Sequence, residues 1–155
     1  MNELTHLDAE GHARMVDVAE REVTTRTATA SGRVTTSAAG VIRSGTAPKG
    51  DVLAVARIAG IMATKRTPDL IPLCHPIAVH GVDVEVSTEP DVDEVRIRAT
   101  VRTADRTGVE MEALTAVAVA GLAVIDMIKA VNPRAALCDV QVEAKDGGRN
   151  GVWRR

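Results

Sequence analysis

The chain has 155 residues, enough for one domain with a substantial core, and its hydrophobic fraction of 45% indicates a globular rather than a disordered protein. The formal net charge of −2 removes the general electrostatic attraction expected of a DNA-binding protein. The chain has no Phe, no Tyr and a single Trp, so it offers no platform on which single-stranded nucleic acid could stack its bases.

The cysteines and the beginning of the sequence indicate a compartment. Cys74 and Cys138 are the only two cysteines, and they have neither the density of a disulfide framework nor the spacing of a zinc site. The sequence begins with polar residues and without the apolar stretch of a signal peptide. We therefore expect a cytoplasmic protein with reduced thiols.

The first half of the chain predicts an arm, a strand and two helices. Residues 1–18 are polar and irregular and predict an extended N-terminal arm. Residues 19–36 are rich in Thr and Val and alternate roughly, which favours a strand with one solvated face. A short helix is expected at 37–44, a Gly- and Pro-containing loop at 45–50, and a helix with regular apolar spacing at 51–64.

Residues 67–76 then read Thr-Pro-Asp-Leu-Ile-Pro-Leu-Cys-His-Pro. Proline is unfavourable inside helices and central strands, so this segment predicts a stiff loop. The loop presents a carboxylate, a thiol and an imidazole, and rigid loops of this kind often carry binding or catalytic groups. A plain connector with a surface histidine is the simpler alternative for Cys74 and His75 taken alone.

The second half predicts a hairpin, a long helix and a last strand. Residues 82–86 and 95–101 alternate apolar and polar residues and are joined by a turn. A helix is expected at about 108–131, a strand at 137–144, and a basic Gly-rich tail at 145–155.

The order of these elements is β-α-β-β-α-β. It predicts an α+β, ferredoxin-like fold, in which an antiparallel sheet carries both helices on one face. The whole chain, 1–155, is expected to form a single domain without repeats or linkers.

The long helix has two unusual features. Thr107 and Glu110 fit a capping box, with Thr107 as the N-cap residue. Beyond it, residues 113–125 contain one polar residue, Thr115, so this stretch should be buried on all sides. It is too short for a membrane span of roughly 20 residues, and one sheet covers only one side of a helix. We therefore expect a second subunit on the other side.

Charged residues stand near both ends of this helix. Asp126 and Lys129 are three residues apart on one face, an arrangement that a surface ion pair would also explain. Glu112 lies about four turns before Asp126, so the two carboxylates face similarly but are about 21 Å apart. If both belong to one kind of site, that site is expected to be shared between two subunits.

Six separated segments together resemble one family closely. They are Lys49-Gly50-Asp51-Val52, Ala56-Arg57-Ile58-Ala59-Gly60-Ile61, the loop from Lys65 to Pro76, Thr107-Gly108-Val109-Glu110-Met111-Glu112-Ala113-Leu114-Thr115, Asp126-Met127-Ile128-Lys129-Ala130-Val131 and Lys145-Asp146-Gly147-Gly148. The chain resembles the cyclic pyranopterin monophosphate synthases, the C proteins of the first step of molybdenum cofactor biosynthesis. The resemblance runs almost end to end. Its departures are mild, with Asp146 where a small polar residue is common and Arg149 where lysine is common.

The resemblance implies an enzyme, a phosphorus–oxygen lyase that assembles as a homo-hexamer of three dimers with active sites at subunit interfaces. Its substrate would be 3′,8-cyclo-7,8-dihydro-GTP, supplied by a radical S-adenosylmethionine GTP cyclase. Its products would be cyclic pyranopterin monophosphate and pyrophosphate. No cofactor would be required, although Mg²⁺ could accompany the phosphates.

The resemblance also implies roles for individual residues. The catalytic positions correspond to Asp126, Lys129 and Lys49. The substrate-binding positions correspond to Leu73, Cys74, His75, Glu110, Met111, Glu112, Lys145 and Arg26, and Lys65 can add a further cation. These types suit the chemistry, because a triphosphate needs local cations and a ring rearrangement needs paired acids and bases. The alternative from another class is a non-catalytic ferredoxin-like module that binds a nucleotide and regulates another protein.

Overall fold

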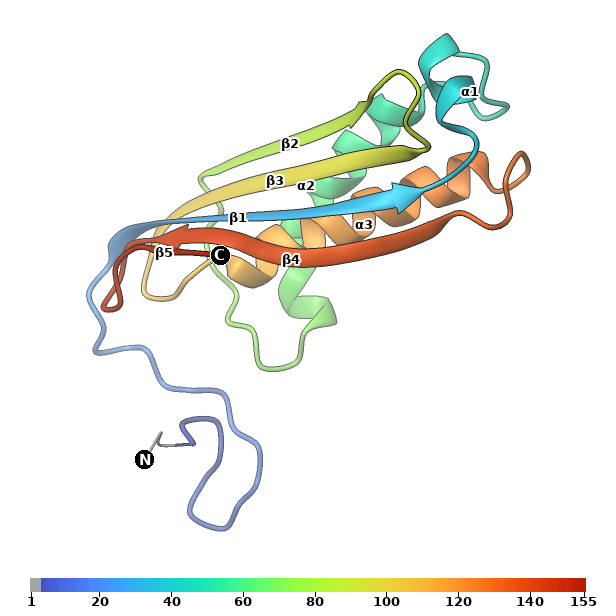
Figure 1. The fold of residues 1–155 in the computed structure, drawn as a ribbon. Helices are drawn as coiled ribbons and strands as arrows, with labels where there is room; N and C mark the ends of the chain where they lie inside the picture. Colours follow the sequence, from blue (N-terminus) through green and yellow to red (C-terminus); the bar gives the residue numbers. More distant parts are fainter. Residues whose placement is uncertain (1–3) are drawn as a thin grey trace.

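A computed structural model of the chain describes residues 4–155, so the first three residues of the expected arm lie outside the described residues. The elements in chain order are β1 (Thr24–Thr35), α1 (Ala39–Ser44), α2 (Val52–Leu70), β2 (Gly81–Thr88), β3 (Glu94–Asp105), α3 (Glu110–Ile128), β4 (Ala136–Asp146) and β5 (Trp153–Arg154). The strands form one sheet in the order β2-β3-β1-β4-β5, in which all neighbours are antiparallel. Helices α2 and α3 cover the same face of the sheet (Figure 1). The expected α+β, ferredoxin-like fold is confirmed.

The alternating pattern of β3 explains how the sheet separates core from solvent. Val95, Ile97 and Val101 are buried under the helices, whereas Arg96 and Arg98 lie between them on the exposed face. This is the two-residue period of a strand with one solvated side. The buried core is made of Ala, Val, Ile and Met side chains from the sheet, α1, α2 and α3, as the absence of Phe and Tyr requires.

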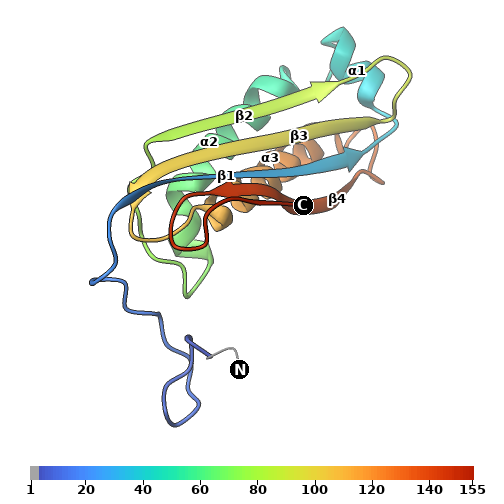
Figure 2. The same cartoon turned by 60° about the vertical axis from the view of Figure 1, so that its left-hand side comes forward.

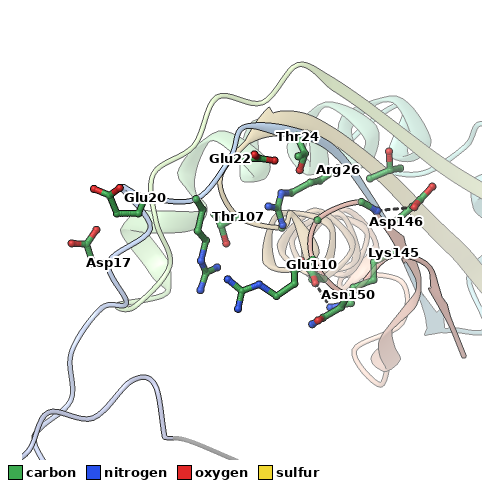
Figure 3. A pocket seen from close by; sticks show the side chains of 16 residues that line it. Asp17, Glu20, Glu22, Thr24, Arg26, Thr107, Glu110, Lys145, Asp146 and Asn150 are labelled. Carbon is green, nitrogen blue, oxygen red and sulfur yellow. Dashed lines mark hydrogen bonds and ion pairs between the residues drawn. The ribbon is translucent and has the colours of Figure 1, made fainter.

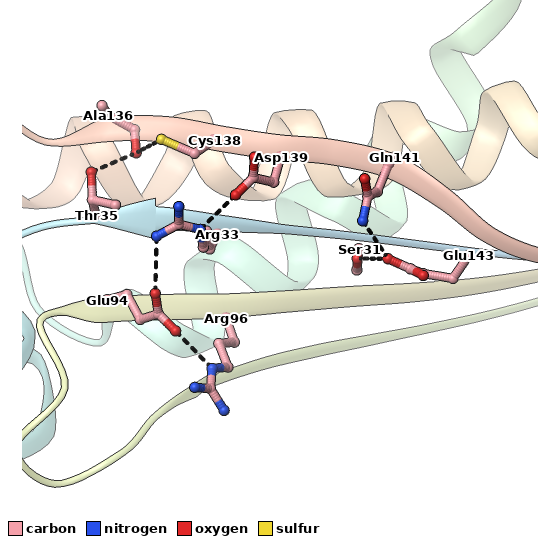
Figure 4. A network of polar contacts seen from close by, with 10 residues as sticks. All are labelled: Ser31, Arg33, Thr35, Glu94, Arg96, Ala136, Cys138, Asp139, Gln141 and Glu143. Atoms are coloured by element: carbon pink, nitrogen blue, oxygen red, sulfur yellow. Dashed lines mark hydrogen bonds and ion pairs between the residues drawn. The ribbon is translucent and has the colours of Figure 1, made fainter. Parts of the chain in front are cut away.

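The face of the sheet opposite the helices carries a network of charged side chains (Figure 4). Arg33 of β1 lies 3.2 Å from Glu94 of β3 and 2.7 Å from Asp139 of β4. Asp139 has a positive φ of 55°, next to an irregularity in the pairing of β1 with β4. These exposed pairs link three strands, and each contributes little stability alone.

Helix α2 is longer than the sequence predicted. The loop prediction for residues 67–70 was wrong, because α2 continues through Pro68 and ends at Leu70. Pro68 cannot donate to the carbonyl of Thr64, but this loses a single bond in the last turn of the helix. Thr64 and Thr67 are buried there, and their hydroxyls donate to backbone carbonyls about one turn earlier. The Cys-His pair therefore lies on a shorter loop, which begins after Leu70.

The capping box predicted for α3 is not formed. Val109 rather than Thr107 is the N-cap residue, and no side chain bonds to the helix end. The carboxylate of Glu110 instead accepts a hydrogen bond from Lys145 Nζ at 2.9 Å. Glu110 and Glu112 still place negative charge in the first turn, where the helix dipole favours it. The carboxylate of Glu110 is therefore bound to Lys145 in the wall of a pocket and does not cap the helix.

Helix α3 is buried on its inner side only. With 19 residues it is long and apolar enough to cross a membrane, so the length argument from the sequence was wrong. However, 56% of its apolar 18-residue stretch is buried inside the fold. Its packing on the sheet and on α2 is that of a core helix. Leu122 remains exposed on α3, and Val55, Ile58 and Met62 form an exposed stripe at helical spacing on α2. The expected subunit contact on this side remains a prediction.

The two ends of the chain differ in how they relate to the sheet. Residues 4–23 are irregular apart from one bridge between Leu7 and Ala13, and this arm reaches away from the sheet (Figure 2). At the other end, the segment predicted as a tail contains β5, which pairs with Ala144 and Lys145 of β4. Lys145 is therefore held in a strand rather than in a loose tail.

Candidate active site

The predicted site residues fall into two groups near opposite ends of α3. The Asp126 cluster consists of Lys49, Asp126 and Lys129 and lies at the C-terminal end of the helix. The remaining candidates lie near its N-terminal end, except Lys65. This confirms that one polar group stands at each end of the helix, as the spacing in the sequence predicted.

The Asp126 cluster joins two segments that are far apart in the sequence. Lys49 Nζ lies 2.8 Å from Asp126 Oδ2, and Lys129 Nζ lies 2.8 Å from Asp126 Oδ1. Lys49 stands in the turn before α2, where Gly50 has a φ of 99° and Asp51 caps the helix through the amide of Ala54. Lys49 is thereby placed beside the end of α3.

The two lysines stabilise the ionised form of Asp126. The hydrogen bond from Lys129, followed by that from Lys49, lowers the pKa of the Asp126 carboxyl to about 2. The side chains are about half exposed, so water and small molecules can reach them. At neutral pH Asp126 is therefore an ionised carboxylate held between two lysine side chains, and the cluster brings together groups of the types that take part in proton transfer.

Glu112 has the opposite environment. Its side chain is only 1% exposed, and burial raises the pKa of its carboxyl. Oε1 accepts a weak hydrogen bond from Cys74 Sγ at 3.6 Å, and Oε2 is buried with no partner among the described residues. Burial, followed by the nearby Glu112 charge, raises the pKa of the Cys74 thiol to about 11. A buried carboxyl with one unused oxygen is suited to pair with a ligand.

Glu112 lines the smaller of two neighbouring pockets. This pocket has a volume of about 260 Å³, and the predicted residues in its wall are Leu73, Cys74, His75, Glu110, Met111 and Glu112. His75 Nε2 is 2.6 Å from the carbonyl oxygen of Val16 in the N-terminal arm. The arm therefore forms one wall of a pocket whose other walls come from the Cys-His loop and α3.

The larger pocket has a volume of about 980 Å³ and is lined by charged residues (Figure 3). Arg26 and Lys145 lie on the neighbouring strands β1 and β4, and Lys145 pairs with Glu110 at 2.9 Å. The two pockets share Arg21, Thr107, Gly108 and Glu110 as lining residues. They therefore adjoin, and a single elongated molecule could occupy both.

Two glycines make room for Arg26. Gly147 and Gly148 have positive φ values of 93° and 73°, which disfavour other residues. A Cβ on Gly147 would meet the Thr25 carbonyl oxygen, and a Cβ on Gly148 would meet the Arg26 guanidinium. The Lys-Asp-Gly-Gly motif thus combines a cation with a close approach of backbone to a neighbouring strand.

The structure does not bring every candidate into these pockets. Lys65 is exposed on α2 and lines neither of them, and the same holds for the three residues of the Asp126 cluster. Sequence reasoning missed Arg21, which lines both pockets. It lies in the irregular arm between Glu20 and Glu22, where no spacing rule distinguishes it from a solvated charge.

Among residues 4–155, no group of three or more His, Cys, Asp or Glu side chains could hold a metal ion. The chemistry visible in the site consists of carboxyls, ammonium and guanidinium groups, an imidazole and a thiol.

The fold and the site define an α+β protein with adjoining pockets that are lined by both basic and acidic side chains and are suited to a small polar molecule. The chain belongs to the MoaC family, whose sequence profile matches residues 15–148. It is 62% identical to a Streptomyces griseus protein named cyclic pyranopterin monophosphate synthase, over 99% of this chain and 87% of the relative. The chain is 57% identical to the Mycobacterium tuberculosis H37Rv protein named cyclic pyranopterin monophosphate synthase 2, over 99% of this chain and 92% of the relative. It is also 57% identical to a Thermomicrobium roseum protein named cyclic pyranopterin monophosphate synthase, over 100% of this chain and 95% of the relative. The resemblance inferred from the sequence motifs is confirmed.

Proposed function

We propose that this protein is a cyclic pyranopterin monophosphate synthase of molybdenum cofactor biosynthesis. It converts 3′,8-cyclo-7,8-dihydro-GTP to cyclic pyranopterin monophosphate and releases pyrophosphate, acting as a phosphorus–oxygen lyase. Family membership supports the reaction. The observation that carries the assignment of the site is the Lys49–Asp126–Lys129 constellation, which joins distant motifs through two contacts of 2.8 Å.

The proposed division of labour follows from the charges. Opening the dihydro-imidazole ring and rebuilding a pterin require repeated proton transfers, which the ionised Asp126 and its two lysines can accept and donate. Closing the cyclic phosphate expels pyrophosphate, which needs cations on the leaving group. Arg26 and Lys145 supply positive charge in the larger pocket, together with Arg21. The smaller pocket, with Glu112, binds the uncharged ring portion through directional hydrogen bonds.

We further propose that each active site combines the two ends of α3 from different subunits of a homo-hexamer, a trimer of dimers. Support comes from the placement of the Asp126 cluster and the Glu112 pocket near opposite ends of one 19-residue helix. The exposed stripe of Val55, Ile58 and Met62 on α2 and Leu122 on α3 gives an apolar surface for such a contact.

The remaining parts of the proposal concern cofactors and partners. The reaction is a rearrangement without net oxidation, so no redox cofactor is required, and Mg²⁺ would enter only with the phosphates. The substrate comes from a radical S-adenosylmethionine GTP cyclase. The protein acts in the cytoplasm, without nucleic acid or membrane as a partner.

The direct test is to incubate the purified protein with enzymatically prepared 3′,8-cyclo-7,8-dihydro-GTP and to measure pyrophosphate and the cyclic product. We expect both products in equal amounts, and a strong loss of both with Asp126→Asn. Binding of the nucleotide without release of pyrophosphate would contradict the proposal and favour the non-catalytic nucleotide-binding module.

A further inference from the structure

Among the described residues, the arm and the Cys-His loop meet at one polar contact. His75 Nε2 lies 2.6 Å from the backbone carbonyl oxygen of Val16, 59 residues earlier in the chain. Val16 and His75 are both half-buried and both line the smaller pocket. The contact is therefore part of the wall around Glu112.

The chemistry of this contact assigns the proton on the ring. A carbonyl oxygen can only accept, so Nε2 must be the nitrogen that carries hydrogen. In a neutral imidazole the other nitrogen, Nδ1, then holds a lone pair. Among the described residues, Nδ1 of His75 has no hydrogen-bond partner, and it is not one of the buried unpartnered atoms. Because His75 lines the smaller pocket, this nitrogen is the ring atom left to accept a hydrogen bond from a ligand there.

The same pocket offers Glu112 in a complementary role. The Cys74 thiol donates to Oε1, and Oε2 is buried without a partner in the described chain. Glu112 Oε2 and His75 Nδ1 are thus two polar atoms without a partner among the described residues. The wall therefore offers two groups of fixed position to a polar ligand.

We propose that the Val16 carbonyl holds His75 as the Nε2–H tautomer, so that Nδ1 accepts a hydrogen bond from an N–H or O–H group of the substrate. Val16 is then a positioning residue that acts through His75. The N-terminal arm helps to define the polarity of the pocket instead of merely covering it. The expected effect on turnover rests on the proposed function, whereas the tautomer does not.

The first test reads the tautomer without substrate. The chain has four histidines, so ¹⁵N-labelled histidine gives few signals in a long-range ¹H–¹⁵N spectrum, and His75→Gln identifies those of His75. At a pH where the ring is neutral, we expect the pattern of one tautomer with hydrogen on Nε2. The exposed His12, whose Nδ1 lies 3.4 Å from Asp8 Oδ2, serves as the internal reference for a ring outside the pocket. A wild-type His75 with hydrogen on Nδ1, or averaged between tautomers, would overturn the proposal.

The second test releases the arm. Val16→Gly removes a half-buried anchor and frees the backbone, whereas Met15→Gly frees the backbone beside an exposed side chain. We expect Val16→Gly to move His75 toward an averaged tautomer and to lower kcat/KM about tenfold, as for one lost hydrogen bond. Met15→Gly should change neither quantity. An unchanged His75 spectrum in Val16→Gly would reject the role of the carbonyl.

The third test separates the two ring nitrogens. His75→Gln keeps a nitrogen donor near the position of Nε2 but lacks the ring lone pair of Nδ1. We expect the variant to fold and to lower kcat/KM about tenfold, as for one lost hydrogen bond. Full activity would show that Nδ1 is not used. If the wild type makes no pyrophosphate at all, the proposed function fails, while the spectrum of the free protein still decides the tautomer.

Discussion

The surroundings of two carboxyl groups on the same helix shift their pKa values in opposite directions. Asp126 is half exposed and held by two lysines, which lower its pKa to about 2. Glu112 is buried, and burial raises its pKa. Residue type alone would make both ionised at neutral pH. The site therefore contains one carboxylate that the lysines keep ionised and one carboxyl whose protonated form is favoured by burial.

The first prediction concerns Asp126. Asp126→Asn keeps the shape of the side chain and removes the group that accepts protons between the two lysines. We expect a folded protein with product formation reduced by about 10² or more, the scale of a lost general acid or base. Steady-state pyrophosphate release measures the loss, and circular dichroism checks the fold. Near-normal turnover would remove Asp126 from the mechanism.

The second prediction concerns the pH dependence of stability through Glu112. Burial raises its pKa, so the folded protein retains a proton that the unfolded chain releases. This contribution to stability is complete at low pH and is lost as pH rises through the folded pKa. Glu112→Gln removes the titration, so the stability of the variant relative to the wild type should increase from about pH 5 to about pH 8.

Urea unfolding at both pH values measures this difference. The control is Glu20→Gln, because Glu20 is exposed on the arm and should give no comparable trend. A constant difference between Glu112→Gln and the wild type would show that Glu112 is solvated in the folded protein.

The third prediction concerns Gly148. A methyl group there would meet the guanidinium of Arg26 and displace it from the larger pocket. We expect Gly148→Ala to raise KM about tenfold, as for one lost contact to a charged group. Gly151→Ala is the matched control, because Gly151 also has a positive φ but no heavy atom within 4 Å of the position that an added methyl group would take. Equal effects in both variants would point to backbone strain alone.

At the scale of elements, the periodicity of apolar residues in the sequence predicted those strands and helices that bury one face in the core. The strands and the long helix were found because one face of each meets the core, and β3 keeps this alternation throughout its length. Local rules failed where tertiary contacts decide the outcome. Pro68 stays helical because the buried Thr64 and Thr67 hold the last turn of α2. Glu110 leaves the expected cap because Lys145, distant in sequence, reaches it.

The site residues that lie in sequence motifs were predictable, whereas those in the irregular arm were not. The motifs identified the residues at both ends of α3, because each motif lies on one continuous segment. Arg21 and the carbonyl of Val16 were not predictable, because the arm has no regular structure whose period could place them. Their positions depend on how the arm crosses the loop that carries His75.

The fourth prediction concerns the contact between the two helices. At Gly60, an added Cβ would lie 3.0 Å from the Ala116 carbonyl oxygen and 3.3 Å from the Ala120 Cβ. Gly60→Val should therefore separate α2 from α3 and lower the free energy of unfolding by about 2 kcal/mol. Gly40→Val in α1 is the control, because its Cβ meets only the flexible end of Arg43, at 3.9 Å. Urea unfolding compares the two, and equal losses would mean that helix propensity alone is responsible.

At the scale of the whole molecule, a single chain leaves the two polar groups apart. The Asp126 cluster lies near one end of α3 and the Glu112 pocket near the other, which the 19 residues of the helix separate. One small substrate cannot reach both ends at a rise of about 1.5 Å per residue. The uncovered apolar stripe on α2 and Leu122 on α3 indicate where a second chain could bring its own helix end into reach.

The fifth prediction tests this sharing. Glu112→Ala and Asp126→Ala are each expected to be inactive, and each is dissociated and reassembled alone as a control. When the two variants are mixed before reassembly, some interfaces combine an intact Asp126 from one chain with an intact Glu112 from the other. Activity should then return to a fraction of the wild-type value, because only part of the interfaces is complete. If mixed oligomers form, as mass spectrometry of differently labelled chains would show, and remain inactive, the two groups do not form a shared site. A monomer in light scattering would reject the assembly itself.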